Sequence, residues 1–107
     1  MDDQQKILIK IMNQLFEIQK KTDGKPELTG ISRNLARIHE YMGEIGLSVH
    51  NPVGEAYNET RTDCEADIAG KISDKMVIAE VIKPIIYSGN ESRKTIVQRG
   101  VVIVQSA

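Results

Sequence analysis

The sequence contains little cysteine, few aromatic residues and no excess of charge of one sign. Among 107 residues there are one cysteine and no tryptophan, aromatic residues make up 4%, and the formal net charge is -1. A single cysteine rules out a disulfide within the chain, as expected in the reducing cytosol. So few aromatic side chains predict an aliphatic core and argue against a large aromatic-lined cofactor pocket. A net charge near zero argues against nucleic acid as the main partner.

Long apolar runs are also missing. No run approaches the ~20 residues that a membrane-spanning helix requires. The polar, acidic start Met1–Gln5 has no secretory signal. We therefore expect a cytoplasmic protein that makes no contact with a membrane. The hydrophobic fraction of 40% is that of a folded globular chain and not of a disordered one.

Two stretches of the N-terminal half have the apolar periodicity of helices. Between them, Asp23-Gly24 and Pro26 predict a turn and the start of a new helix. Gly46 is expected to end the second helix. The first helix, within residues 4–21, has apolar residues at spacing 3-4-3, namely Leu8, Ile11, Leu15 and Ile18, and the stripe is widened by Ile7, Met12 and Phe16. The second has them at spacing 3-4-3-4-3, the heptad seam of helix bundles, namely Leu28, Ile31, Leu35, Ile38, Met42 and Ile45.

A helical hairpin alone would leave much of both apolar stripes in water. One partner helix cannot cover all of these side chains, each of which contributes ~1.5–3 kcal/mol when fully buried. We therefore predict a homodimer in which two hairpins form a four-helix bundle, with the ten apolar positions as the dimer contact. The alternative is that the helices pack on the C-terminal half of their own chain.

After residue 50 the pattern changes to short β-branched runs, which predict strands. The runs are Met76–Ile82, Lys83–Tyr87, Thr95–Val97 and Gly100–Val104, with a hairpin loop expected at Ser88–Ser92. Pro84 predicts a sheet edge or a bulge at that point. We thus expect an α+β protein with a helical dimerisation region over residues 1–47 and a small all-β domain over residues 48–107.

Few residues suggest catalysis. Cys64 could pair with His39 or His50 as a nucleophile, but no local motif supports such a pair. Three acidic residues alternate around Cys64 and could bind a metal, although a solvated strand face explains them as well; they are Asp63, Glu65 and Asp67. The chain has no glycine-rich phosphate loop, zinc-ligand spacing or serine triad signature. We predict that the protein is not an enzyme and needs no metal or cofactor.

The charges of the second helix are arranged unfavourably for an isolated helix. Arg33 and Arg37 lie towards its start, and Glu40 and Glu44 lie towards its end. Both pairs are like-charged at i,i+4, and both ends oppose the helix dipole, each at a cost of a few tenths of a kcal/mol. Either a partner protein contacts these charges, or the first helix or a second copy neutralises them.

The segment from Gly30 to Val49, GISRNLARIHEYMGEIGLSV, resembles the last bundle helix of GrpE, the nucleotide-exchange factor of DnaK-type chaperones. In that family a Gly-hydrophobic pair closes the segment, as Gly46-Leu47 does here. A Pro-x-Gly-Glu-x-Phe/Tyr-Asp/Asn signature follows, which Pro52–Asn58 matches. Three later stretches resemble the family's last strands, namely Ala79–Lys83, Tyr87 and Val101–Val104. The resemblance covers residues 28–105, without the family's long N-terminal helix.

This resemblance implies a dimeric co-chaperone that promotes ADP/ATP exchange on a DnaK-type ATPase domain. The resemblance implies that Gly30, Ile82 and Val104 contact the chaperone, from their positions in the family pattern. We add Arg33 and Arg37 to these candidate contact residues because of the charges of the second helix. Each of the first three also has a structural alternative. For Gly30 it is close helix packing, and for Ile82 and Val104 it is a place in the sheet core. The chain departs from the family at Thr62 or Cys64, where the family has histidine, and at Gln98, where it has arginine. The second hypothesis is therefore a dimeric adaptor on the same fold without exchange activity.

Overall fold

The computed structural model describes residues 2–107 and has an α+β fold, as predicted. Helix α1 runs from Asp3 to Thr22, a 3-10 turn follows over Pro26–Leu28, and helix α2 runs from Thr29 to Glu44. The Asp2 carboxylate caps α1 by accepting a hydrogen bond from the Gln5 backbone N–H (2.7 Å). At the end of α2, Gly46 adopts a φ of +83°, a conformation that favours glycine. Both predicted helices and the predicted turn between them are confirmed.

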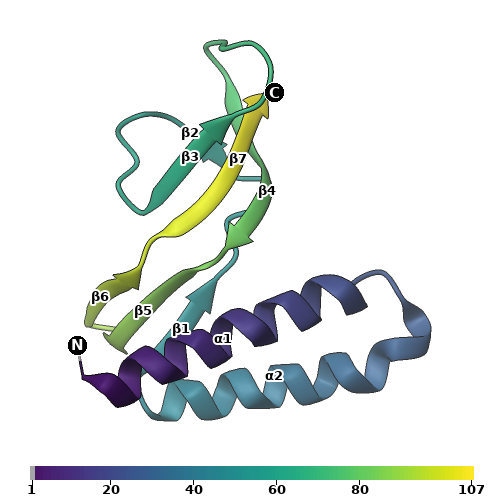
Figure 1. The fold of residues 1–107 in the computed structure, drawn as a ribbon, viewed down its shortest axis with the longest axis vertical. Coiled ribbons are helices and arrows are strands. Elements are labelled where there is room, and N and C mark those ends of the chain that lie inside the picture. The colour runs from purple at the N-terminus through teal and green to yellow at the C-terminus, as the bar shows by residue number, and fades with distance from the viewer. Residues whose placement is uncertain (1) are drawn as a thin grey trace.

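In the described part of the chain, residues 2–107, seven strands form two sheets (Figure 1). The three-stranded sheet has the order β1-β5-β6, and the four-stranded sheet has the order β2-β4-β7-β3, in which only β3 and β7 are parallel. The strands are β1 Leu47–His50, β2 Ala56–Tyr57, β3 Cys64–Ile68, β4 Met76–Lys83, β5 Ile85–Asn90, β6 Arg93–Gln98 and β7 Gly100–Ser106.

One long bent hairpin joins the two sheets. Strand β4 continues into β5 through the buried Pro84, and β6 continues into β7 through Arg99. The pairing of β4 with β7 shifts between Val81 and Lys83, just before Pro84, so an irregularity lies next to the position where the sequence predicts an edge or a bulge. Neither β4 nor β5 is an edge strand. The turn at the tip is tighter than the predicted loop, because β5 and β6 leave only Glu91 and Ser92 between them.

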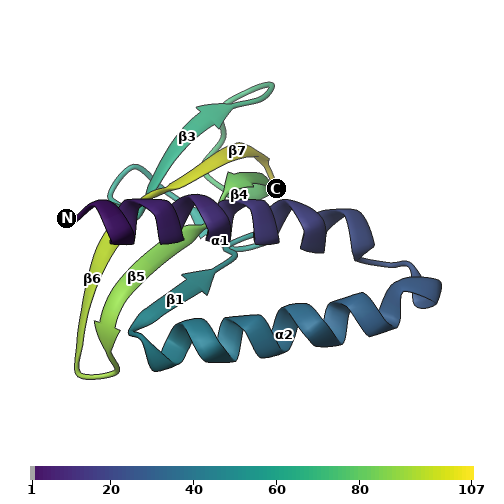
Figure 2. The ribbon, with the colours of Figure 1, turned by 60° about the horizontal axis from the view of Figure 1, so that its bottom comes forward.

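Helix α1 packs across the strands and contributes to both hydrophobic clusters (Figure 2). Its Phe16 packs with residues of the four-stranded sheet, including Ile78 and Val102. Its Ile9 and Met12 join Leu47, Ile86 and Met42 of α2 in the second cluster. Spacing of three and four residues places Ile9, Met12 and Phe16 on one face of α1, which contacts the sheets. The predicted stripe is therefore buried along its Met12 and Phe16 side and not along its four central positions.

The predicted stripe of α1 therefore needs correction. Ile11 and Ile18 are exposed, and Leu8 and Leu15 are only half-buried. Helix α1 follows the alternative prediction: it packs on the strands of its own chain, which bury Ile9, Met12 and Phe16. The two antiparallel helices form a hairpin, but a single copy contains no four-helix bundle. Along α2, Leu35 and Met42 are buried, Leu28 and Ile38 are half-buried, and Ile31 and Ile45 are exposed.

Candidate functional site

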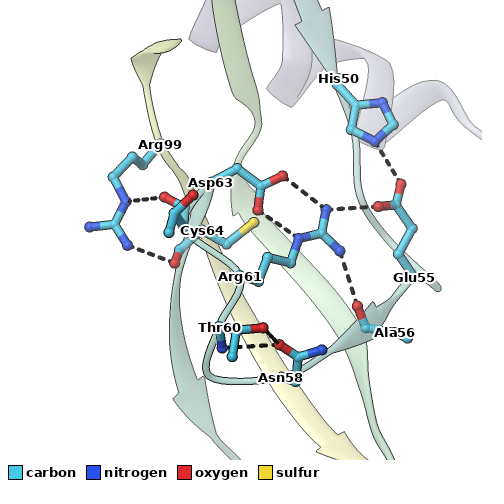
Figure 3. Close-up of polar contacts among 10 residues, drawn as sticks. His50, Glu55, Ala56, Asn58, Thr60, Arg61, Asp63, Cys64 and Arg99 are labelled. Carbon is cyan, nitrogen blue, oxygen red and sulfur yellow. Dashed lines mark hydrogen bonds and ion pairs between the residues drawn. The ribbon is translucent and has the colours of Figure 1, made fainter.

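A network of charged side chains connects the end of β1 with the start of β3 (Figure 3). Arg61 lies at its centre. Its Nε and Nη2 donate to the Asp63 carboxylate at 2.6 and 3.2 Å, and Nη2 also donates to Glu55 Oε1 at 2.8 Å. Its Nη1 donates to the carbonyl oxygen of Ala56 (3.0 Å). The other Glu55 oxygen lies 2.6 Å from His50 Nε2.

Local backbone structure brings these side chains together. The Asn51 side chain accepts from the Val53 N–H (3.2 Å), and Gly54 has a φ of +85°. The loop is then joined to β4, because the Gly54 N–H donates to Ile78 O (2.8 Å) and the Ile78 N–H donates to Glu55 O (2.9 Å). A second turn begins at Asn58, whose carbonyl accepts from the Arg61 N–H (3.1 Å). The Pro52–Glu55 part of the Pro52–Asn58 signature thus forms a loop that is hydrogen-bonded to β4.

The network holds its charges in one state. The Arg61 guanidinium lowers the pKa of Asp63 and the pKa of Glu55 by hydrogen bonding to both carboxylates. The same contacts, Asp63 first, raise the pKa of Arg61. Carboxylates whose pKa is lowered remain ionised at neutral pH and are poor general acids. We interpret the network as a positioning device for the loop and not as a catalytic group.

The candidate nucleophile Cys64 lies beside this network and is only 2% exposed. Burial raises the pKa of its thiol, and the nearby Asp63 raises it further. A buried thiol of raised pKa is a weak nucleophile. Among the bonds recorded for residues 2–107, neither His39 nor His50 is hydrogen-bonded to it.

The alternating acidic residues each have an ordinary structural explanation or lie in solvent. Asp63 is paired with Arg61, Glu65 is paired with Arg99 at 3.0 Å, and Asp67 is exposed. Arg99 also donates to the carbonyl oxygens of Thr62 and Cys64, so it holds the start of β3. Within residues 2–107 no group of three potential ligands is arranged to hold a metal ion.

Three of the predicted partner-contact residues lie together on α2. Gly30, Arg33 and Arg37 line one shallow surface hollow, with Glu27, Leu28, Ile31 and Asn34 completing its wall. Nothing lies within 4 Å of a Cβ placed on Gly30, so close helix packing inside the chain does not explain this glycine. Over residues 2–107 no ion pair is recorded for Arg33, Arg37, Glu40 or Glu44. The first helix therefore does not neutralise these charges.

The other two predicted contact residues lie on the sheet and differ from each other. Ile82 on β4 is 41% exposed, and its side chain is accessible to a partner. Val104 on β7 is 0% exposed and belongs to the hydrophobic cluster around Phe16. The prediction that Val104 contacts a partner is therefore corrected, because its side chain fills the sheet core.

Sequence reasoning did not single out Arg61, which makes more contacts with charged groups than any residue it named. The available signal was an arginine flanked by Glu55 and Asp63 in a segment rich in turn residues. Gln98, where the resemblance expects arginine, exchanges hydrogen bonds with Asn13 of α1 at 2.9 Å and donates to Pro84 O at 2.8 Å. It thus ties α1 to the bend between the sheets.

Comparisons of the chain with protein-family models, with curated proteins and with solved structures found no match. In the described chain, 2–107, neither helix has the length and apolar character needed to cross a bilayer.

Proposed function

We propose that this chain is a GrpE-like co-chaperone that forms a homodimer and promotes ADP/ATP exchange on a DnaK-type chaperone ATPase domain. The observation that carries the proposal is the segment from Gly30 to Tyr57. In it an exposed helix, the glycine turn at Gly46 and the loop Pro52–Glu55 occur in the order that resembles GrpE. The hydrogen bonds of that loop to β4, and the Arg61 contacts, give this signature a structural role in the fold.

The homodimer is supported by apolar side chains that the single copy leaves in water. Five large ones on the two helices and one directly after α2 are between 42% and 61% exposed, namely Ile7, Ile11, Ile18, Ile31, Tyr41 and Ile45. Soluble monomers expose scattered apolar residues, but a row repeated along two adjacent helices is typical of an interface. A second copy that offers the same row would remove both from water.

The partner contact is assigned to Gly30 of α2 and Ile82 of β4, whose positions are open to a second protein. Arg33 and Arg37 border the same hollow as Gly30. Two proteins are candidates to contact these arginines, the chaperone and a second copy of this chain.

The proposed mechanism needs no proton transfer, metal or cofactor. The protein binds the open cleft of the ATPase domain more tightly than the closed one, and nucleotide does the opposite. Each ligand then weakens the binding of the other by the same factor, with a coupling free energy of typically ~1–3 kcal/mol. ADP consequently leaves faster, and ATP rebinding releases the factor.

The test is the rate of ADP release from DnaK-type ATPase domains with and without the full chain. We expect faster release with the chain. Ile82→Lys should reduce this acceleration at least ~10-fold, as for loss of an apolar contact at an interface. Ile72→Lys is the matched control, because Ile72 is a still more exposed isoleucine (76%) in the loop between β3 and β4. No acceleration with any candidate ATPase domain would rule out the exchange function.

The second candidate, a dimeric adaptor without exchange activity, is favoured by the departures from the family pattern. Cys64 is buried, and Gln98 is bonded inside the fold where the resemblance expects arginine. Such an adaptor would bind the ATPase domain in pull-down and leave the rate of ADP release unchanged.

A further inference from the structure

Strand β3 forms an edge of the four-stranded sheet. In the strand order β2-β4-β7-β3, the strand that pairs with β3 within residues 2–107 is β7, and the two run parallel. The Gly100 N–H donates to Asp63 O at 2.9 Å, and the Ala69 N–H donates to Val104 O at 2.8 Å. The backbone groups of successive strand residues point to alternate edges, so the odd-numbered residues of β3 bond to β7 and the even-numbered ones point away from it.

A side chain confirms which backbone groups point outward. The Cys64 carbonyl oxygen accepts a hydrogen bond from Arg99 Nη2 at 2.8 Å, so Arg99 covers the start of the outer edge (Figure 3). Further along, no partner is recorded within residues 2–107 for the outward N–H and C=O groups of Ala66 and Ile68. Unpaired strand edges are templates for pairing with another chain, and β3 has neither a proline nor a bulge to prevent it.

The two faces of β3 differ in polarity along this edge. Cys64 and Ala66 pack with the hydrophobic cluster around Phe16, and alternation places Ile68, which is 48% exposed, on the same face. Glu65 and Asp67 lie on the opposite face. Glu65 is paired with Arg99, whereas Asp67 is exposed and no ion pair is recorded for it within residues 2–107. The outer edge therefore offers a free negative charge next to an exposed apolar residue.

A second copy of the chain fits this edge poorly. Two β3 strands paired antiparallel about Ala66 would place Glu65 of each copy opposite Asp67 of the other, because both are one residue away from Ala66. Like charges directly opposite each other are destabilising. The β6 edge of another copy carries Arg93 and Lys94, but pairing β3 with β6 would leave a free edge on each copy and form an open chain of molecules. The edge thus favours a different polypeptide.

We propose that the outer edge of β3 binds an extended segment of a partner protein, which adds to the four-stranded sheet as a further strand antiparallel to β3. The N–H and C=O groups of Ala66 and Ile68 bond to the backbone of that segment. A basic residue of the segment lies opposite Asp67, and the apolar residues before and after it lie against Ala66 and Ile68. This surface includes none of the residues assigned to the chaperone contact, so it does not depend on the exchange function.

The experiment is NMR titration of the full chain with the peptide acetyl-Thr-Val-Lys-Val-Thr-amide, up to about 1 mM. We expect saturable shifts of the backbone amide resonances of Ala66 and Ile68. Two matched peptides separate the contributions. N-methylation of both valines removes the donors to the edge and should weaken binding about 10-fold or more. Replacing the lysine by glutamate places like charges opposite each other and should weaken binding about 5-fold.

Two variants test the edge from the side of the protein. The Ala66 N–H points away from β7, so Ala66→Pro should keep the pairing with β7 while it removes the outward donor. It should bind the lysine peptide about 10-fold more weakly or worse. Asp67→Lys should bind the lysine peptide about 5-fold more weakly and prefer the glutamate peptide. Asp74→Lys, in the exposed loop before β4, makes the same change in net charge and should bind like the native chain.

Three results would overturn the proposal: no saturable shift at Ala66 and Ile68, equal binding of the N-methylated peptide, and equal binding of the lysine peptide by Asp67→Lys and Asp74→Lys. Circular dichroism verifies that each variant is folded, and the peptide series and Asp67→Lys decide the outcome if Ala66→Pro is not. Sedimentation velocity of the chain alone tests the second copy. Assemblies that grow with concentration and disappear in Asp67→Lys would assign the edge to another copy and so refute a separate partner.

Discussion

Replacing Arg61 by glutamine is expected to destabilise the fold by about 2–3 kcal/mol at neutral pH. The Arg61 side chain is 18% exposed, and the Asp63 and Glu55 side chains with which it pairs are 23% and 38% exposed. Hydrogen bonds to charged groups contribute about 1.5–3 kcal/mol when buried, and exposed ion pairs contribute at most about 1 kcal/mol. The Asp63 contact therefore supplies most of the expected loss, and the more exposed Glu55 contact adds a smaller part.

The loss should depend on pH in a defined direction. Arg61 lowers the pKa of Asp63 and of Glu55 below their ordinary values of 3.8 and 4.5 in the folded chain. Stability from a lowered carboxylate pKa is present above the ordinary value and disappears as the pH falls through the folded value. The difference in stability between the native chain and Arg61→Gln should therefore be largest at neutral pH and should shrink below about pH 4.

Urea unfolding at fixed protein concentration, measured from neutral to acidic pH, tests this reasoning. Lys71→Gln is the control, because Lys71 is exposed and forms none of the ion pairs recorded for residues 2–107. A difference under about 0.5 kcal/mol at neutral pH, which is usual for surface substitutions, would refute the structural role of Arg61. A difference that stays constant into acid would refute the electrostatic explanation.

Three further predictions concern the fold. Phe16→Ala should destabilise the chain by about 3–5 kcal/mol in urea unfolding, because Phe16 is 4% exposed and joins α1 to the sheet core; a loss near zero would contradict this packing. Gly89→Ala should disrupt the β5–β6 hairpin, since its φ is +117° and a Cβ there would clash with the carbonyl oxygen of Arg93; an unchanged melting temperature would contradict the close approach. Within residues 2–107 the two buried ring nitrogens of His39 have no hydrogen-bond partner, and burial lowers the pKa of His39 from 6.5. The stability of the fold should therefore be full above pH 6.5 and fall as the pH drops below it. His39→Leu should remove that part of the acid dependence, and an equal slope in both proteins between neutral pH and about pH 5 would contradict the assignment.

The helices, their turn and most strands could be predicted from the sequence because they depend on local physics. The spacing of Leu28 to Ile45 produces an apolar stripe only in a helix. Gly46 ends α2 in a conformation that glycine adopts without strain, and Pro84 cannot continue a strand ladder. Each of these follows from the residue and its near neighbours, so the α+β class was already determined at that level.

The tertiary structure alone decided which side of α1 faces the strands and which charged residues form the site. Two apolar faces compete on α1, and spacing cannot rank Ile9, Met12 and Phe16 above Leu8, Ile11 and Leu15, because both sets have helical periodicity. The choice depends on the shape of a sheet whose strands lie more than 25 residues away along the chain. The role of Arg61 also depends on tertiary structure, because its contacts exist only after the loop at Gly54 has bonded to β4. Val104 is a core residue and not a partner contact, because β3 and β4 pair on both sides of β7.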